Sequence, residues 1–351
     1  MTLGPLMIDL QGLEMTEEEK EIIHHPLVGG VILFSRNYDS VEQVSALIEN
    51  IQADRHTRLI IAVDHEGGAV QRFRHEFTRL PACAELGKVY DRNVDKALVL
   101  SYDLGWVMAS ELRTVHVDLS FAPILDLGGI SRVINNRAFH KKPDIIAKLA
   151  FAYRHGMNDA GMAAVGKHFP GHGSVEEDSH HEIPVDERTF AEIEEHDLIP
   201  FKKMIENGLE AIMPAHVIYP QVDNVPAGFS IFWLQEVLRK KLNFQGTIFS
   251  DDMSMAGAQV GGDFVERTHK ALEAGCDMVL ICNDREGAIK VLDNLGEYNE
   301  PVSQVRLIRM HGRKAMTHEQ LVRDEKWQQR VKRLNTLIPD QELDLGDDEL
   351  L

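Results

Sequence analysis

Short runs of apolar and β-branched residues recur along the chain, and longer helical patterns separate them. The runs that predict strands cover residues 6–9, 30–34, 59–64, 119–123, 163–166, 211–214, 247–250 and 278–281. Unlike the strands of a half-exposed antiparallel sheet, these eight runs do not alternate between apolar and polar positions. The pattern therefore predicts a parallel sheet that helices cover on both faces.

The intervening helices begin at residues that satisfy unpaired backbone N–H groups. Thr16 with Glu19, and Ser40 with Gln43, have the spacing of a capping box, in which each side chain accepts a hydrogen bond from the other residue's N–H. Pro143 suits the first turn of a helix because it lacks the N–H that would stay unpaired there. The longer helical patterns cover residues 95–115, 144–156, 187–206, 232–241, 264–274, 300–310 and 317–337.

The order of these elements predicts the fold class. Eight strand–helix units without a low-complexity linker indicate an α/β protein with one closed (β/α)8 barrel of the TIM type over residues 1–338. A doubly wound open sheet is the alternative, but no G-x-G-x-x-G turn follows the first strand. Residues 339–351 are acidic, and we expect them to form a disordered tail.

Composition narrows the classes of partner. The chain has 351 residues, of which 44% are hydrophobic, so it can build a sizeable core. Its 37 Lys and Arg residues against 56 Asp and Glu residues give a formal net charge of −19, which argues against binding to nucleic acid or to an anionic membrane. The N-terminus lacks the pattern of a signal peptide, and no apolar run approaches the ~20 residues that span a bilayer. We therefore expect a cytoplasmic protein.

Cysteine chemistry is not indicated. Cys83, Cys276 and Cys282 are too few and too irregularly spaced for a disulfide framework or a zinc ribbon. Cys276 and Cys282 flank an apolar strand, and we expect both thiols to lie in the core.

The densest group of ionisable residues follows the fifth predicted strand. The segment Lys167-His168-Phe169-Pro170-Gly171-His172-Gly173 continues to Asp178-Ser179-His180. Its proline and glycines interrupt regular structure, so a loop is predicted. Three histidines and a lysine at the end of a buried strand suggest a cleft, although a solvated surface loop is the alternative. We further expect residues 170–184 to be mobile and to close over a substrate.

Polar residues also follow the other predicted strands, where a parallel barrel gathers its active-site groups. They are Asp64, Asp126, His216, Asp251, Asp252 and Asn283. Arg72, Arg74 and Arg137 lie on the loops after the third and fourth strands, and their forked guanidinium groups suit carboxylates or paired hydroxyls. For Asp252 and Ser254, capping of the next helix is an equal alternative.

Five of these segments together resemble a known family. They are residues 62–68 (AVDHEGG), 166–173 (GKHFPGHG), 178–180 (DSH), 213–216 (MPAH) and 249–255 (FSDDMSM). In this order they resemble the β-N-acetylglucosaminidases of glycoside hydrolase family 3, in their compact bacterial form. The resemblance extends from about Leu6 to the helix around Trp327. His65 and Ala69 depart from it, because the family more often has Gln and Arg there.

The resemblance implies a retaining β-N-acetylhexosaminidase that forms a covalent glycosyl-enzyme on Asp251. It assigns the acid/base role to His180, supported by Asp178. A histidine suits this task because an exposed carboxyl titrates near about 4, whereas imidazole titrates near about 6.5. The residues that the resemblance assigns to sugar binding are Asp64, Arg72, Arg137, Lys167, His168 and His216. It implies no metal and no cofactor.

The implied substrate is peptidoglycan-derived. The compact family members remove terminal β-linked N-acetylglucosamine from 1,6-anhydro-muropeptides during peptidoglycan recycling, a part of cell-wall biogenesis that affects cell shape and division. The resemblance thus predicts a sugar partner.

Two other classes compete with this interpretation. A metal-dependent hydrolase on the same barrel could use His168, His180, His216 and Asp251 as ligands. The chain has no H-x-H on the first strand and no H-E-x-x-H, and Lys167 would repel a cation. A sugar-binding protein without activity is disfavoured by the intact Asp251, Asp178 and His180. Release of 4-nitrophenol from its N-acetyl-β-glucosaminide in the presence of EDTA would exclude both rivals.

Overall fold

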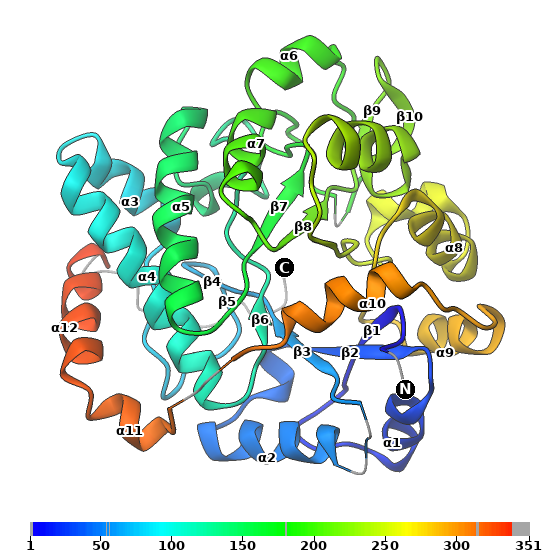
Figure 1. Cartoon of the computed structure of the whole chain (residues 1–351), viewed down its shortest axis with the longest axis horizontal. Coiled ribbons are helices and arrows are strands. Elements are labelled where there is room, and N and C mark those ends of the chain that lie inside the picture. The colour runs from blue at the N-terminus through cyan, green and yellow to red at the C-terminus, as the bar shows by residue number, and fades with distance from the viewer. Residues whose placement is uncertain (1–2, 54, 56, 180, 314–315, 339–351) are drawn as a thin grey trace.

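Strands form at or beside all eight predicted runs in the chain, whose structure here is a computed structural model (Figure 1). It describes residues 3–53, 55, 57–179, 181–313 and 316–338, so the tail predicted over 339–351 lies outside the described residues. The strands are β1 (Leu6–Asp9), β2 (Val28–Leu33), β3 (Ile60–Val63), β6 (Leu119–Ser120), β7 (Val165–Phe169), β8 (Ala211–Pro214), β11 (Thr247–Ile248) and β12 (Val279–Ile281). β7 runs through Lys167 and His168, which the sequence placed in a loop.

All of these strands pair in parallel, as predicted. One sheet has the order β12-β1-β2-β3-β6, and a second has the order β11-β8-β7. Isolated bridges, Ile124 with Lys167 and Phe249 with Met278, link the two sheets. Further backbone hydrogen bonds join the same segments, among them Val165 N to the Ala122 carbonyl oxygen and Ser250 N to the Met278 carbonyl oxygen. The expectation of one closed, continuously paired barrel is therefore not met. Part of the reason is Pro123, which follows the two-residue β6 and has no N–H to donate to a ladder.

Two short antiparallel pairs were not predicted. β4 (His65–Gly67) pairs with β5 (Val70–Gln71) directly after β3, and β9 (Ile218–Tyr219) pairs with β10 (Asp223–Pro226) after β8. Gly67 and Gly68 have φ of 104° and 60°, a conformation that a side chain disfavours, and they make the turn between β4 and β5.

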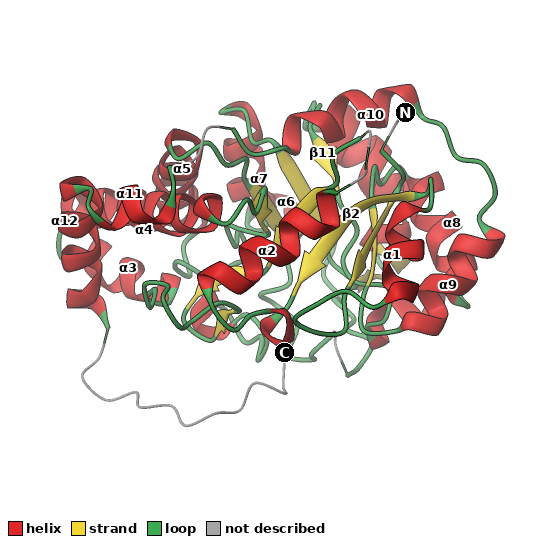
Figure 2. Ribbon diagram, turned by 90° about the horizontal axis from the view of Figure 1, so that it is seen from below, coloured by secondary structure: helices red, strands yellow, loops and turns green. Residues whose placement is uncertain are grey.

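Helices lie outside the strands (Figure 2). They are α1 (Glu17–His24), α2 (Val41–Gln52), α3 (Cys83–Tyr90), α4 (Val94–Thr114), α5 (Pro143–Asp159), α6 (Phe190–Glu195), α7 (Leu198–Glu206), α8 (Phe264–Ala274), α9 (Arg285–Asn294), α10 (Pro301–Leu307), α11 (His318–Val322) and α12 (Glu325–Leu334). A π-helix covers Phe232–Lys241. Thr16 and Glu19 form the predicted capping box, whereas Gln43 accepts from Asp39 N instead of Ser40 N.

Two predicted helices are each divided. The pattern over 187–206 becomes α6 and α7, because Pro200 fits the first turn of a new helix but would interrupt the hydrogen bonds of a continuous one. The pattern over 317–337 becomes α11 and α12, and Asp324 caps the second by accepting from Trp327 N.

The core has two main apolar clusters. Along a strand, neighbouring residues belong to different clusters. Leu6 and Ile8 belong to the larger cluster, which includes residues of the helices, whereas Met7 belongs to the smaller one. The smaller cluster joins residues of both sheets, among them Ile60 and Met213. Cys276 and Cys282 are buried, as expected. Opposite faces of each strand are thus both covered, which explains the continuous apolar runs.

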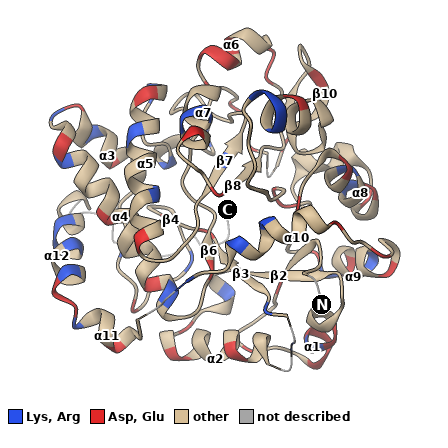
Figure 3. Ribbon diagram, in the orientation of Figure 1, with Lys and Arg blue, Asp and Glu red and all other residues tan. Residues whose placement is uncertain are grey.

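Charged side chains are spread over the outer helices. Figure 3 shows Asp and Glu on α1, α2 and α6, and Lys and Arg on α10 and α12. No helix in the described part of the chain combines the length and apolarity needed to cross a bilayer.

Helices α4 and α5 pack closely through glycine, which gives a testable prediction. A Cβ on Gly105 would lie 2.0 Å from the carbonyl oxygen of Tyr153, whereas a Cβ on Gly12 would meet nothing within 4 Å. Gly105→Ala should therefore lose about 3 kcal/mol from overpacking, more than the about 1 kcal/mol gained in helix propensity. Denaturant unfolding, with Gly12→Ala as the control, measures the difference. Equal stability of the two variants would contradict the close packing.

Candidate active site

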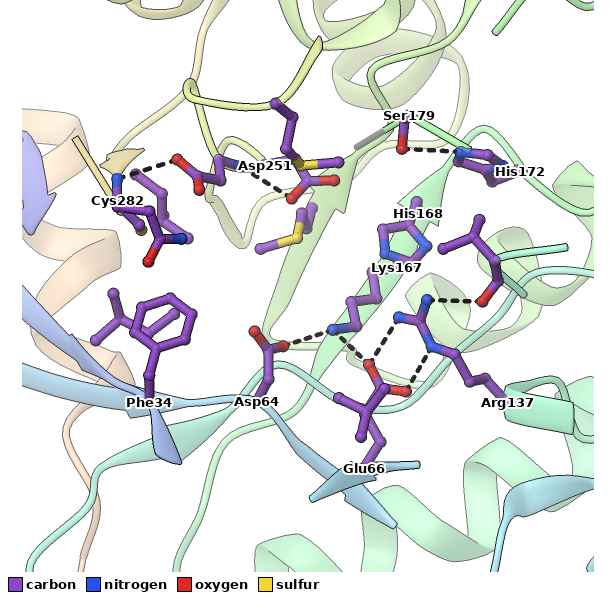
Figure 4. A pocket seen from close by; sticks show the side chains of 18 of the residues that line it. Phe34, Asp64, Glu66, Arg137, Lys167, His168, His172, Ser179, Asp251 and Cys282 are labelled. Carbon is purple, nitrogen blue, oxygen red and sulfur yellow. Dashed lines mark hydrogen bonds and ion pairs between the residues drawn. The ribbon is translucent and has the colours of Figure 1, made fainter. Parts of the chain in front are cut away.

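A pocket opens where the carboxyl ends of the strands meet (Figure 4). Its described lining residues are Ile32, Phe34, Asp64, Glu66, Val70, Arg72, Val133, Arg137, Lys167, His168, His172, Ser179, Met213, Asp251, Asp252, Met255, Leu280, Cys282 and Asn283. They come from the ends of β2, β3, β7, β8, β11 and β12 and from the loops beside them. Parallel strands end at one rim, so residues far apart in sequence converge there.

Four charged side chains form a cluster on one wall of this pocket. Lys167 Nζ lies 2.8 Å from Asp64 Oδ1 and 2.7 Å from Glu66 Oε1. Arg137 donates from Nε and Nη2 to the two oxygens of Glu66, at 2.9 and 2.8 Å, and from Nη1 to the carbonyl oxygen of Val133. Figure 4 shows Glu66 between the ends of Lys167 and Arg137.

The pairing keeps these groups charged despite their burial. Burial by itself raises the pKa of Glu66, but Arg137 and Lys167 hold that pKa well below its usual value. Burial lowers the pKa of Lys167 and of Arg137, and the neighbouring carboxylates raise both above their usual values. At neutral pH the cluster therefore consists of two cations and two anions.

Asp126, which follows β6 in sequence, contacts a second group of polar residues. Its Oδ2 accepts from His168 N at 3.0 Å and lies 2.7 Å from His168 Nδ1, and its Oδ1 accepts from His172 N at 2.7 Å. Burial opposes ionisation of Asp126, but His168 and His172 hold its pKa below the usual value. The carboxylate thereby fixes the ring of His168 against the pocket.

His172 connects this group to the segment that carries Asp178. Its Nε2 lies 3.1 Å from Ser179 Oγ, and Gly257 N donates to the carbonyl oxygen of Ser179 at 3.0 Å. Burial lowers the pKa of His172 to about 4, so the ring is neutral at pH 7. Ser179 itself is buried. The segment is thus held from two sides in this structure, and its expected mobility stays a prediction.

Asp251 and Asp252 follow β11 and have different surroundings. Asp251 lines the pocket, and its Oδ1 accepts from Asp252 N at 2.9 Å. Asp252 Oδ1 accepts from Ser254 N and Cys282 N, each at 3.0 Å, and its Oδ2 accepts from Ser254 Oγ at 2.6 Å. Burial raises the pKa of Asp252 to about 7. The Asp252 carboxyl thus joins the end of β11 to the end of β12.

Comparison with known proteins identifies the family of this site. Residues 5–310 match the glycosyl hydrolase family 3 N-terminal domain. The chain belongs to glycoside hydrolase family 3. It is 54% identical over 348 residues to a protein named beta-hexosaminidase from Thioalkalivibrio sulfidiphilus, with 98% of this chain and 100% of that protein covered. A beta-hexosaminidase from Nitrosospira multiformis is 55% identical over 314 residues, covering 89% of this chain and 90% of that protein.

A solved structure supports the same family. NagZ from Neisseria gonorrhoeae, in complex with N-trifluoroacetyl-D-glucosamine, superposes with a TM-score of 0.91 at 42% identity, covering 96% of this chain and 98% of that one. The protein is therefore a glycoside hydrolase of the β-hexosaminidase type. This outcome confirms the family that the sequence motifs indicated.

Most residues that the sequence assigned to sugar binding and nucleophilic attack share the pocket of this family 3 enzyme. Those that line it are Asp64, Arg72, Arg137, Lys167, His168 and Asp251. Asp178 is half-buried on the loop after β7 and is not among the described lining residues. His180 lies outside the described residues.

His216, which the resemblance also assigned to sugar binding, is not among the described residues that line the pocket. It is buried, and its Nε2 lies 3.0 Å from the carbonyl oxygen of Asp252. Burial lowers the pKa of this imidazole. Among the described residues His216 lies behind the pocket wall, where it supports the backbone of the Asp251-Asp252 turn.

The sequence argument did not assign roles to Glu66, His172 and Ser179. Glu66 and His172 occur there only within the motifs of residues 62–68 and 166–173. The missed signal was charge balance, since two cations buried at strand ends require more than the single carboxylate of Asp64. For metal binding, no group of three suitable His, Cys, Asp or Glu side chains occurs within the described ranges.

The raised pKa of Asp252 predicts a pH-dependent stability. Its folded pKa of about 7 exceeds the unfolded value of about 3.9, so between these values the folded state retains a proton that the unfolded state has lost. Unfolding free energy should fall as pH rises through this window and level off above it. Asp252→Asn removes the titrating carboxyl and with it this fall in unfolding free energy. Relative to the unsubstituted protein it should gain up to about 4 kcal/mol between pH 4 and 7.

Urea unfolding at several pH values measures this difference, and other carboxylates cancel from it. A difference that does not change with pH would contradict the protonated state of Asp252.

Proposed function

We propose that this family 3 enzyme removes terminal, non-reducing β-linked N-acetylglucosamine with retention of configuration. Asp251 acts as the nucleophile and forms a covalent glycosyl-enzyme. His180 protonates the leaving oxygen and then activates water, and Asp178 stabilises its imidazolium form. The observation that carries the proposal is the shared pocket in which the Asp251 carboxylate meets the Asp64, Arg137, Lys167 and His168 group.

The pocket suits a sugar with several hydroxyl groups. Lys167 and Arg137 present N–H donors, and Asp64 presents carboxylate oxygens that accept from hydroxyls. Apolar lining side chains such as Val133 and Met255 suit the C–H faces of a pyranose ring. The named relatives are beta-hexosaminidases, and the N. gonorrhoeae protein binds an N-acylated glucosamine. These features together support N-acetylglucosamine as the released sugar.

We extend the proposal to the biological substrate and the architecture. The compact family members indicate 1,6-anhydro-muropeptides of peptidoglycan recycling in the cytoplasm, with effects on cell-wall biogenesis, shape and division. The bridges between the two parallel sheets, and the apolar cluster that both sheets share, support a (β/α)8 arrangement of the TIM type over residues 1–338, in which the strands are not paired continuously around the barrel.

Covalent labelling tests the nucleophile. A 5-fluoro N-acetylglucosaminyl fluoride should inactivate the enzyme, and mass spectrometry of its peptides should place the sugar on Asp251. The Asp252→Asn variant should still be labelled, because Ser254 and Cys282 hold the Asp252 carboxyl and that carboxyl does not attack the sugar. Excess N-acetylglucosamine should slow the labelling. A label on Asp252 would overturn the assignment.

A leaving-group series tests the acid. His180→Ala should lose about 10²–10⁴-fold in kcat/KM on substrates with poor leaving groups, the usual contribution of general acid catalysis. It should lose far less on aryl glycosides whose leaving group departs unassisted, because Asp251 is intact. Asp178→Ala should lose some of this activity, but less than His180→Ala loses. A loss that does not vary with the leaving-group pKa would assign His180 to binding or folding.

A further inference from the structure

Glu66 is the most deeply buried carboxylate of the charged cluster, with 3% of its side chain exposed against 22% for Asp64. We propose that Glu66 is a positioning residue that also sets the charge selectivity of the pocket, by orienting Lys167 and Arg137 and by keeping the four-residue cluster electrically neutral. The inference rests on the proposed function, in which Lys167 and Arg137 bind the sugar.

The orientation of Arg137 depends on Glu66. Both oxygens of Glu66 accept from the guanidinium, in the paired geometry that fixes the plane of an arginine fork. A third N–H is directed to the Val133 carbonyl oxygen. Of the five N–H groups of an arginine, these bonds use three, so two can donate to a ligand.

The orientation of Lys167 depends on the same carboxylate. Glu66 Oε1 and Asp64 Oδ1 lie 2.7 and 2.8 Å from Lys167 Nζ, and 4% of the lysine side chain is exposed. An ammonium group has three N–H donors. With two directed at carboxylates, the direction of the third is fixed, and Lys167 lines the pocket.

Charge balance is the second consequence. Two carboxylates and two cations give the cluster a net charge of zero. The other charged groups of the described lining are Arg72 and Asp251, whose opposite charges cancel. The lining also has the titratable Asp252, His168 and His172. Such a wall offers hydrogen bonds to uncharged hydroxyls, but it has no surplus positive charge to compensate the desolvation of an anionic sugar. The geometry therefore favours a neutral sugar ring.

Three variants separate these roles. Glu66→Gln keeps the size and removes the charge, and Glu66→Asp keeps the charge and shortens the reach. Asp103→Asn is the matched control. Like Glu66, Asp103 is buried and pairs with two cations, here Arg330 and Arg333, but it is not among the described residues of the pocket.

Calorimetric titration with N-acetylglucosamine and with N-acetylglucosamine 6-phosphate reads out the selectivity. The unsubstituted enzyme should prefer the neutral sugar. Glu66→Gln should bind the neutral sugar about tenfold more weakly and lose most of the discrimination against the phosphate, a change of about tenfold or more in the ratio of the two affinities. Glu66→Asp should bind both more weakly at an unchanged ratio. Asp103→Asn should change thermal stability but neither affinity.

The pH dependence of binding adds a readout that a purely structural role would not move. Asp64 and Glu66 hold the pKa of Lys167 above its usual value against the opposing effect of burial. Loss of one carboxylate should lower it, so Glu66→Gln should lose affinity for N-acetylglucosamine at a lower pH than the unsubstituted enzyme does. The inference would be overturned if Glu66→Gln left both the ratio of the two affinities and the pH dependence of binding unchanged. If Glu66→Gln did not fold, an altered ratio of affinities in Glu66→Asp would overturn it. If the unsubstituted enzyme failed to bind N-acetylglucosamine, the proposed function would fail first, and this inference with it.

Discussion

Burial of Lys167 and Arg137 at the rim of the sheets is the constraint on which the pocket depends. Removing an unpaired cation from water costs several kcal/mol, so each needs a carboxylate at contact distance. Glu66 and Asp64 provide these contacts from the segment that follows β3. The turn through Gly67 and Gly68 follows directly, and β4 and β5 are too short to be explained by apolar packing alone. Neutral hydrogen bonds also hold this segment, among them Gly68 N to the Leu80 carbonyl oxygen and His65 N to Ser120 Oγ.

The same reasoning applies to Asp126 and its two histidines. A buried carboxylate is tolerated when several donors satisfy it, and here His168 and His172 both do so. Because His172 also contacts Ser179, the pocket wall and the segment next to Asp178 form one hydrogen-bonded unit. Movement of that segment would have to break the contact with His172 and the Gly257 N–H bond to Ser179.

Asp251 and Asp252 show how environment separates two adjacent carboxyl groups. Asp252 accepts three hydrogen bonds, and burial still raises its pKa to about 7. Both residues are half-buried and line the pocket. Ser254 and Cys282 hold the Asp252 carboxyl, which is why we propose Asp251 as the carboxylate that reaches a bound sugar. His216 stabilises this arrangement through the Asp252 carbonyl oxygen.

The sequence by itself determined the parallel α/β architecture, the approximate strand positions, the strand-end chemistry and, through its motifs, the family. These features are local, because apolar runs, caps and breakers act within a few residues. Only the tertiary structure decided that Glu66 joins Lys167 to Arg137, that His216 lies behind the wall, and that the strands pair as two linked sheets. Lys167 and Asp64 are 103 residues apart in sequence. Which donors and acceptors meet across such a separation depends on packing and on the need to satisfy every buried charge, and no local pattern records it.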